Sequence, residues 1–177
     1  MNLHSGVERR GDELYREEMD FFWGWLALVL FFVAEVAFII LFVIQRTSGP
    51  IGSDPEPDWY YFAFIVFYFV LDILMANFTK LTITADPQGI TAAYGRIRHF
   101  EPWDNIESAE LDKSSALRSY GGWGIRFGWR KEGAVSVYNL MRAPTVLLKL
   151  KQGKRRYFGF STRHPDEVMS LVNRWKK

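Results

Sequence analysis

Cysteine is absent from this chain of 177 residues, and histidine occurs only three times. Without cysteine the chain has no disulfide scaffold, no cysteine nucleophile, no cysteine-ligated zinc and no iron–sulfur cluster. His4, His99 and His164 lie far apart in the sequence, which disfavours a histidine-rich metal site. We therefore expect neither a metal nor any other cofactor.

Groups that could perform catalysis are also scarce. Ser114, Ser115 and Ser161 have no histidine and acid at a spacing that indicates a catalytic triad. The four acids at positions 104, 107, 110 and 112 suggest a metal site by composition alone, but their spread over a turn and a strand is typical of surface charge. The sequence therefore favours a protein that is not an enzyme.

Two long apolar runs occupy much of the first half of the chain. Residues 21–44 contain one charged residue, Glu35, and residues 59–78 contain only Asp72. At about 1.5 Å per helical residue the first run reaches about 36 Å, which exceeds the roughly 30 Å of a bilayer's hydrocarbon core. Both runs predict transmembrane helices, joined by a linker over residues 45–58 that contains three prolines and two glycines.

Two alternatives to this transmembrane hairpin are less favoured. Buried helices of a soluble core seldom stay apolar on every face for about 20 residues. A cleaved signal peptide has a shorter apolar segment followed by small residues at the cleavage site, and residues 21–44 have neither feature.

Positive charges beside the two runs predict their orientation. The polar arm of residues 1–20 carries three arginines, whereas the linker carries only Arg46. The segment after the second run begins with Lys80 and soon adds two arginines. Because positively charged flanks remain in the cytoplasm, we expect a multi-pass protein of the cytoplasmic membrane with both termini inside.

Residues 79–177 predict a β-rich domain of about seven short strands that ends in a helix near residues 165–175. Alternating apolar residues over 81–85 and 90–94 flank a turn that begins Asp86-Pro87, which is typical of a β-hairpin. The apolar residues at 168, 171, 172 and 175 form one stripe of an amphipathic helix. The chain as a whole therefore predicts an α+β membrane protein.

Five segments of this domain carry a resemblance to a known family. They are ITADPQGI at 83–90, Pro102-Trp103 with Ile106-Glu107, SYGGWGIR at 119–126, LKLKQGKR at 148–155, and Pro165-Asp166-Glu167. These segments resemble the bacterial pleckstrin-homology-like (PH-like) domain, and the whole chain is similar to a prokaryotic family of uncharacterised proteins in which two transmembrane helices precede such a domain. The resemblance implies an antiparallel β-barrel of seven strands capped by the C-terminal helix, and it implies no reaction.

The most specific part of the resemblance is a glycine-rich loop. Its signature residues are Tyr120, Gly121, Gly122, Trp123, Gly124 and Arg126. The loop has neither the GxGxxG nor the GxxxxGK spacing of a phosphate-binding loop, and no helix pattern follows it. Tight backbone geometry is the favoured interpretation, and contact with a ligand or partner is the alternative.

Basic residues are concentrated after the second run. Residues 79–177 hold 18 Lys and Arg against 9 Asp and Glu, so this part carries a formal charge of +9. A basic cluster of Lys149, Lys151, Lys154, Arg155 and Arg156 lies within one predicted hairpin. Attraction to anionic lipids of the inner leaflet and a merely solvated face are equally favoured interpretations. Nucleic acid is not an expected partner, because the aromatic residues belong mainly to the membrane spans and the core.

Glu35 and Asp72 are functional candidates because charged groups inside a membrane are unfavourable. Counted along ideal helices, Glu35 lies about 21 Å and Asp72 about 9 Å from the inner ends of their spans, so a direct pair is not expected. We expect polar contacts within the hairpin or with a second copy, and proton or ion transport is the alternative.

These patterns favour a membrane-anchored PH-like module for binding and assembly on the cytoplasmic face. Its expected partners are the lipid bilayer, anionic lipids, and a second copy or another membrane protein. The alternative function is a subunit of an oligomeric transporter or channel that uses the intramembrane acids, and an enzyme is the least favoured class.

Overall fold

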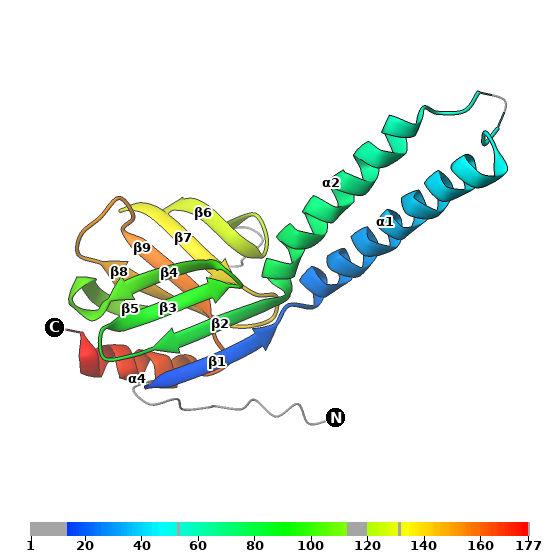
Figure 1. Ribbon diagram of the computed structural model, residues 1–177. Helices are drawn as coiled ribbons and strands as arrows, with labels where there is room; N and C mark the ends of the chain where they lie inside the picture. The colour runs from blue at the N-terminus through cyan, green and yellow to red at the C-terminus, as the bar shows by residue number, and fades with distance from the viewer. Residues whose placement is uncertain (1–13, 53, 113–119, 131, 177) are drawn as a thin grey trace. The chain divides into compact units, whose positions relative to one another are not determined.

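Two apolar helices and two β-sheets form this α+β chain, as the computed structural model shows for residues 14–52, 54–112, 120–130 and 132–176 (Figure 1). The chain divides into two units: a helical unit of residues 22–79, and a sheet unit that combines residues 1–21 with residues 80–177. The sheet unit is therefore discontinuous in sequence, with the helical unit inserted into it.

The helical unit consists of α1 (Phe22–Ser48) and α2 (Asp58–Ala76), followed by the short 3₁₀ helix η1 (Asn77–Thr79). Aromatic rings pack between the two helices, and Phe38 stacks on Phe64 with their centroids 4.7 Å apart. At the other end of the pair, a Cβ on Gly24 would overlap the carbonyl oxygen of Phe78, so glycine permits the close approach of the two helices there.

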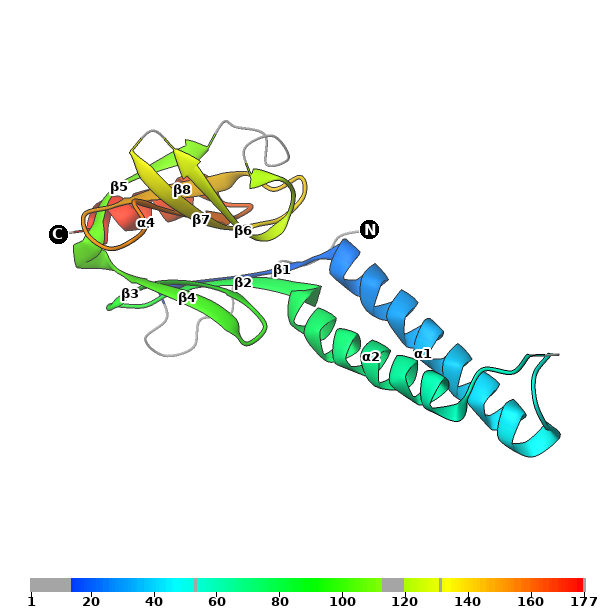
Figure 2. The same cartoon turned by 90° about the horizontal axis from the view of Figure 1, so that it is seen from above.

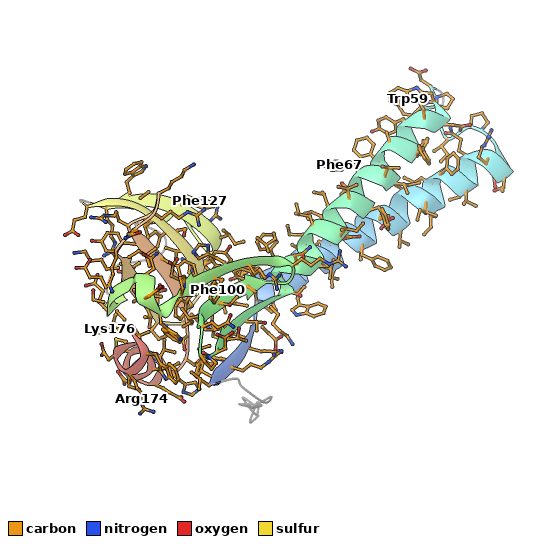
Figure 3. The ribbon with its side chains drawn as sticks, turned by 60° about the vertical axis from the view of Figure 1, so that its left-hand side comes forward. Trp59, Phe67, Phe100, Phe127, Arg174 and Lys176 are labelled. Atoms are coloured by element: carbon orange, nitrogen blue, oxygen red, sulfur yellow. The ribbon has the colours of Figure 1, made fainter. Side chains whose placement is uncertain are left out.

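The outer surfaces of both helices are apolar and exposed, as Trp59 and Phe67 illustrate in Figure 3. Both α1 and the α2–η1 segment are long and apolar enough to cross a membrane. Because their apolar side chains are not covered by the rest of the described chain, these helices are not the core helices of a soluble domain.

The sheet unit contains two sheets, drawn as separate layers in Figure 2. The first sheet has the order β1 (Tyr15–Asp20), β2 (Lys80–Ala85), β3 (Gly89–Tyr94), β4 (Ile97–Pro102), and all its pairs are antiparallel. The second sheet has the order β5 (Ile106–Asp112), β8 (Thr145–Leu150), β9 (Tyr157–Ser161), β7 (Gly133–Asn139), β6 (Gly124–Arg130). Within it, β7 and β9 pair in parallel and the other neighbours pair antiparallel.

The expected antiparallel barrel is wrong, because neither sheet closes. After β4 the 3₁₀ turn η2 (Trp103–Asn105) redirects the chain, and β5 begins the second sheet instead of continuing the first. Proline at position 102 has no backbone N–H to extend the ladder, which is a physical reason for the break. Among the described residues after position 79 there are eight strands, rather than about seven.

The core lies between the inner faces of the two sheets. Tyr94 of β3 stacks on Tyr138 of β7 and donates a hydrogen bond of 2.7 Å to the carbonyl oxygen of Asn139. Near the middle of the layers, the ring of His99 lies 4.3 Å from that of Phe158. The inner face of the second sheet continues through apolar residues of β8 and β9, all fully buried.

The predicted C-terminal helix is present as α4 (Pro165–Trp175). Its buried residues are Val168 and Val172, two positions of the predicted stripe, and Trp175 is half-buried. The helix packs against β5 and β8. Proline at the first position and two acids in the first turn favour its start.

Strand β1 is the element that sequence analysis missed, because residues 1–20 were expected to form only a polar arm. Its pattern alternates, with Tyr15, Glu17 and Met19 buried against the core and the intervening residues partly or fully exposed. Glu17 occupies a core position, which hides the period-2 pattern from a hydrophobicity scan. The expectation that residues 79–177 contain every strand is therefore wrong.

Glu17 joins β1 to the segment that precedes α4. Its carboxylate accepts hydrogen bonds from the hydroxyl of Tyr15 at 2.7 Å, the hydroxyl of Thr162 at 2.6 Å and the backbone N–H of Arg163 at 2.9 Å. A carboxylate that is only 4% exposed is tolerated because these three donors replace water.

Joining β1 directly to β2 should yield a folded sheet unit without the helices. Asp20 and Lys80 are opposite each other, so an Asn-Gly turn between residues 1–20 and 80–177 matches a two-residue hairpin. We expect this variant to be soluble and to melt cooperatively by circular dichroism. The fragment 79–177 should melt at a lower temperature or aggregate, because β2 would have an open edge. Equal melting of the two proteins would contradict an essential role for β1.

Replacing Glu17 with alanine should destabilise the sheet unit strongly. Each buried donor left without an acceptor costs about 1–3 kcal/mol, so the melting temperature of the full chain in detergent should fall clearly. Glu18→Ala is the matched control, because Glu18 is an exposed neighbour whose ion pairs with Arg16 and Lys80 contribute about 1 kcal/mol or less. Equal melting temperatures for the two variants would contradict the role assigned to Glu17.

Candidate functional site

The basic cluster divides into one neutralised residue and four residues of the β8–β9 connection. Lys149 forms ion pairs with Glu107 at 3.3 Å and Glu132 at 3.0 Å. The contact with Lys149 is the largest cause that holds the pKa of Glu132 below its usual value, and a hydrogen bond from the hydroxyl of Tyr157 adds to it. Lys149 is therefore part of the surface charge balance of the second sheet.

The β8–β9 connection is longer than the tight hairpin expected at Gln152-Gly153, and it spans residues 151–156. Neighbouring segments hold it in place, because Asn105 bonds the backbone of Lys151 and Gln152, and Arg156 donates its N–H to the carbonyl of Ala134. In the described part of the chain, no carboxylate forms an ion pair with Lys154 or either arginine of this connection.

Two exposed aromatic residues on β6 lie beside this connection, and sequence analysis did not single them out. Phe127 is 67% exposed and Trp129 is 83% exposed, and Figure 3 shows Phe127 at the surface of the sheet unit. The guanidinium of Arg155 lies 5.2 Å from the centroid of the Phe127 ring and donates to the hydroxyl of Ser136. The alternation apolar–basic along residues 125–130 was the signal available in the sequence.

β6 is also an edge strand, since among the described strands it pairs with β7 alone. Its alternate side chains point to opposite faces, so Phe127 and Trp129 share one face while Arg126 and Arg130 share the other. Arg130 is paired, with its guanidinium 2.8 Å from Asp112 and 3.4 Å from Glu110. We use the term docking edge for Arg126, Phe127 and Trp129 of β6 together with Lys154, Arg155 and Arg156.

The glycine-rich loop supports the start of β6. Gly121, Gly122 and Gly124 have positive φ angles that glycine adopts readily. The carbonyl of Gly122 accepts from the side chain of Asn139, and the carbonyl of Trp123 accepts from Arg126. These contacts agree with the structural interpretation of the loop.

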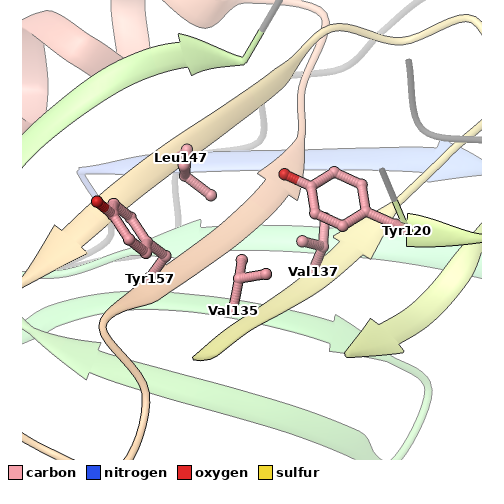
Figure 4. Close-up of a cluster of buried hydrophobic side chains, with 5 residues drawn as sticks. All are labelled: Tyr120, Val135, Val137, Leu147 and Tyr157. Atoms are coloured by element: carbon pink, nitrogen blue, oxygen red, sulfur yellow. The ribbon is translucent and has the colours of Figure 1, made fainter. Parts of the chain in front are cut away.

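Tyr120 of the signature belongs to a small hydrophobic cluster on the other face of the second sheet, with Val135, Val137, Leu147 and Tyr157 (Figure 4). Its hydroxyl donates to Asp112 at 2.5 Å and accepts from Arg130 at 3.2 Å. Burial is the largest cause that raises the pKa of Tyr120, and the hydrogen bond to Asp112 adds to it. β5 and β6 are the two edge strands of the second sheet. The side chains of Asp112 on β5 and Arg130 on β6 connect these strands, and the hydroxyl of Tyr120 bonds to both.

Glu35 and Asp72, the two acids of the apolar helices, are neighbours, so the depth argument against a direct pair is wrong. The Glu35 carboxyl interacts with that of Asp72. Helical side chains lean toward the N-terminus of their own helix, and the two helices are antiparallel, so these two side chains lean toward each other. Both carboxylate oxygens of Asp72 are buried, and within the described chain neither makes a well-formed hydrogen bond.

The described residues contain no group of three or more side chains that could hold a metal ion. The acids between positions 104 and 112 that suggested a metal site are separated, and Glu107, Glu110 and Asp112 pair with cations. Beside Asp104 and Asn105 lies an open hollow of about 390 Å³, lined also by Pro102 and residues 151–153. Its mixed lining contains no arrangement of nucleophile and base.

No family model, no curated protein and no solved structure matches this chain.

Proposed function

We propose that this protein is a membrane-anchored, non-catalytic module for binding and assembly. In this proposal α1 and α2 form a hairpin across the cytoplasmic membrane, and the sheet unit is a PH-like domain displayed in the cytoplasm. The observation that carries the proposal is the pairing of β1 with β2, which places Asp20 opposite Lys80 at the two ends of the apolar segment.

This pairing requires both ends of the hairpin to lie on one side of the bilayer. Strand β1 ends two residues before α1 begins, and β2 begins immediately after η1. Two strands held about 5 Å apart cannot emerge on opposite sides of a membrane. The arginine-rich arm and the +9 charge of residues 79–177 then favour the cytoplasmic side.

The PH-like assignment is supported by the order of elements in the sheet unit. Antiparallel strands come first, and a single amphipathic helix follows the last strand and packs on the second sheet. Binding rather than catalysis is supported by the docking edge, where exposed aromatic residues of an edge strand lie beside the cations of the β8–β9 connection.

The absence of native cysteine permits a direct test of the orientation. A cysteine at the exposed linker position Asp54 should react with an impermeant maleimide in intact cells, whereas one at the exposed position Gln152 should react only after lysis. Each variant is its own control, since both should react fully in detergent. Labelling of Gln152→Cys in intact cells would contradict the proposed topology.

Transport is the second candidate function, because Glu35 and Asp72 lie together inside the hairpin with the oxygens of Asp72 buried. We expect Glu35→Gln and Asp72→Asn to weaken association of the helices or of several copies, by about 0.6–2 kcal/mol for each polar contact. Crosslinking measures association, and proton flux in liposomes measures transport. Unchanged association together with lost flux would favour the transporter over the binding module.

A further inference from the structure

We propose that the docking edge binds an extended acidic segment of a cytoplasmic partner, which adds to β6 as a further strand. This inference rests on the proposed function and names the kind of partner that the module would recruit. It goes beyond the attraction to lipid suggested by the basic cluster, because an edge strand with exposed aromatic residues can pair with an extended chain but not with a lipid headgroup.

The docking edge runs along the length of the second sheet, because β6 extends from Gly124, paired with Asn139, to Arg130, paired with Gly133. The start of β6 lies at the end of the sheet unit where the chain enters and leaves the helical unit. At that end of the sheet unit Lys80 is paired with Asp20, and the next residue of β2, Leu81, is paired with Tyr94. Tyr94 in turn bonds Asn139, the last residue of β7. The β8–β9 connection lies at the opposite end of the sheets, as Figure 1 shows within this unit.

The contacts of Trp129 place it at that opposite end. Trp129 is paired with Ala134 at the start of β7, and the carbonyl of Ala134 accepts from the backbone of Arg156. The guanidinium of Arg156 donates to the carbonyl of Lys151. Trp129 and the basic connection therefore form one continuous surface at the end of the sheet unit opposite Asp20 and Lys80, and Phe127 extends this surface along β6.

The open side of an edge strand supplies the general affinity for an extended segment. The outer edge of β6 presents backbone N–H and C=O groups that pair with no other strand among the described residues. A segment that adds to such an edge gains main-chain hydrogen bonds, while its alternate side chains determine specificity. Trp, Phe and Arg are enriched in protein interfaces, and Trp and Arg are enriched among the residues that contribute most of the binding energy.

The two faces of β6 predict the sequence pattern of the partner. Apolar side chains at every second position would cover Phe127 and Trp129, and the side chains between them would face Arg126. In the described chain Arg126 forms no ion pair, so acids at those positions would complement it. Acids beyond the strand would reach Lys154 and Arg156.

A second copy of this chain is a poorer occupant. Residues 79–177 carry a net charge of +9, and pairing two docking edges would bring their cations together. A lipid surface suits the charge, but lipid headgroups cannot form the strand pairing that the outer edge of β6 offers among the described strands. An acidic segment agrees with both the charge and the backbone groups of the edge.

The test uses the full chain in nanodiscs of zwitterionic lipid and a fluorescent peptide of four Val-Glu repeats, with binding followed by anisotropy. We expect saturable binding that weakens as salt is raised, because the attraction is electrostatic. A peptide of four Val-Lys repeats should not bind, and a Val-Glu peptide with prolines at its centre should bind weakly because proline cannot pair.

Variants of the edge locate the binding. Trp129→Ser should weaken binding at least about thirtyfold, the effect expected of an interface residue that contributes most of the energy. Phe100→Ser is the matched control, since Phe100 is 45% exposed on β4, on the outer face of the first sheet (Figure 3). Arg126→Gln with Lys154→Gln should weaken binding about threefold to twentyfold, whereas Arg142→Gln with Arg174→Gln should leave it unchanged.

Each other outcome overturns the inference. No binding of the Val-Glu peptide, or equal binding to the wild type and Trp129→Ser, excludes an acidic strand at this edge. Disulfide-linked dimers of Phe127→Cys would assign the edge to a second copy, and shielding of a nitroxide at that cysteine only in nanodiscs with phosphatidylglycerol would assign it to lipid. A failure of the Asp54 and Gln152 labelling pattern would instead overturn the proposed topology, and peptide binding is measured independently of it.

Discussion

The antiparallel pairing of β1 with β2 is the constraint on which the rest of this structure depends. The pairing joins residues that are about 60 positions apart, with the whole helical unit between Asp20 and Lys80. A strand that precedes the helices therefore completes a sheet formed by strands that follow them. The segment that contains the two apolar helices begins after β1 and ends before β2, and these two strands are neighbours in the first sheet. The helical hairpin is therefore an insertion into the sheet unit rather than an N-terminal addition to it.

Side-chain chemistry secures this arrangement on both faces of β1. On the buried face, Glu17 connects the strand to Thr162 and Arg163, just before α4. On the outer face, Lys80 lies 2.7 Å from Glu18, which lowers the pKa of Glu18 and raises that of Lys80 through their shared hydrogen bond. Strand β1, which directly precedes the helical unit in sequence, thus has polar contacts to both its partner strand and the C-terminal part of the sheet unit.

The second sheet balances most of its charge on one face and leaves the docking edge unbalanced. Lys149 and Arg130 pair with four acids, Glu107, Glu110, Asp112 and Glu132, on the face that carries the Tyr120 cluster. Arg155, by contrast, lies over the ring of Phe127. This asymmetry distinguishes cations that pair with carboxylates from cations that form no ion pair among the described residues.

The sequence by itself determined the elements whose signal is local. Two apolar runs predicted the helices, alternation predicted most strands after residue 79, and the stripe ending at Trp175 predicted α4 with its bounds. These predictions succeeded because the spacing of apolar residues and the residue types of turns depend on positions that are close together in the sequence. The concentration of cations in residues 149–156 was likewise visible without a structure.

Only the tertiary structure decided the features that depend on distant residues. In the sequence Glu17 has the character of a surface acid, and for this reason residues 1–20 were predicted to form a polar arm. In the fold its carboxylate is buried because donors near residue 162 bond to it. The separation of Glu35 and Asp72 was judged from residue heights alone, whereas the opposite lean of side chains on antiparallel helices brings them together. The exposure of Trp129 depends on β6 being an edge strand, and strand order is set by pairings between segments that the local pattern does not specify.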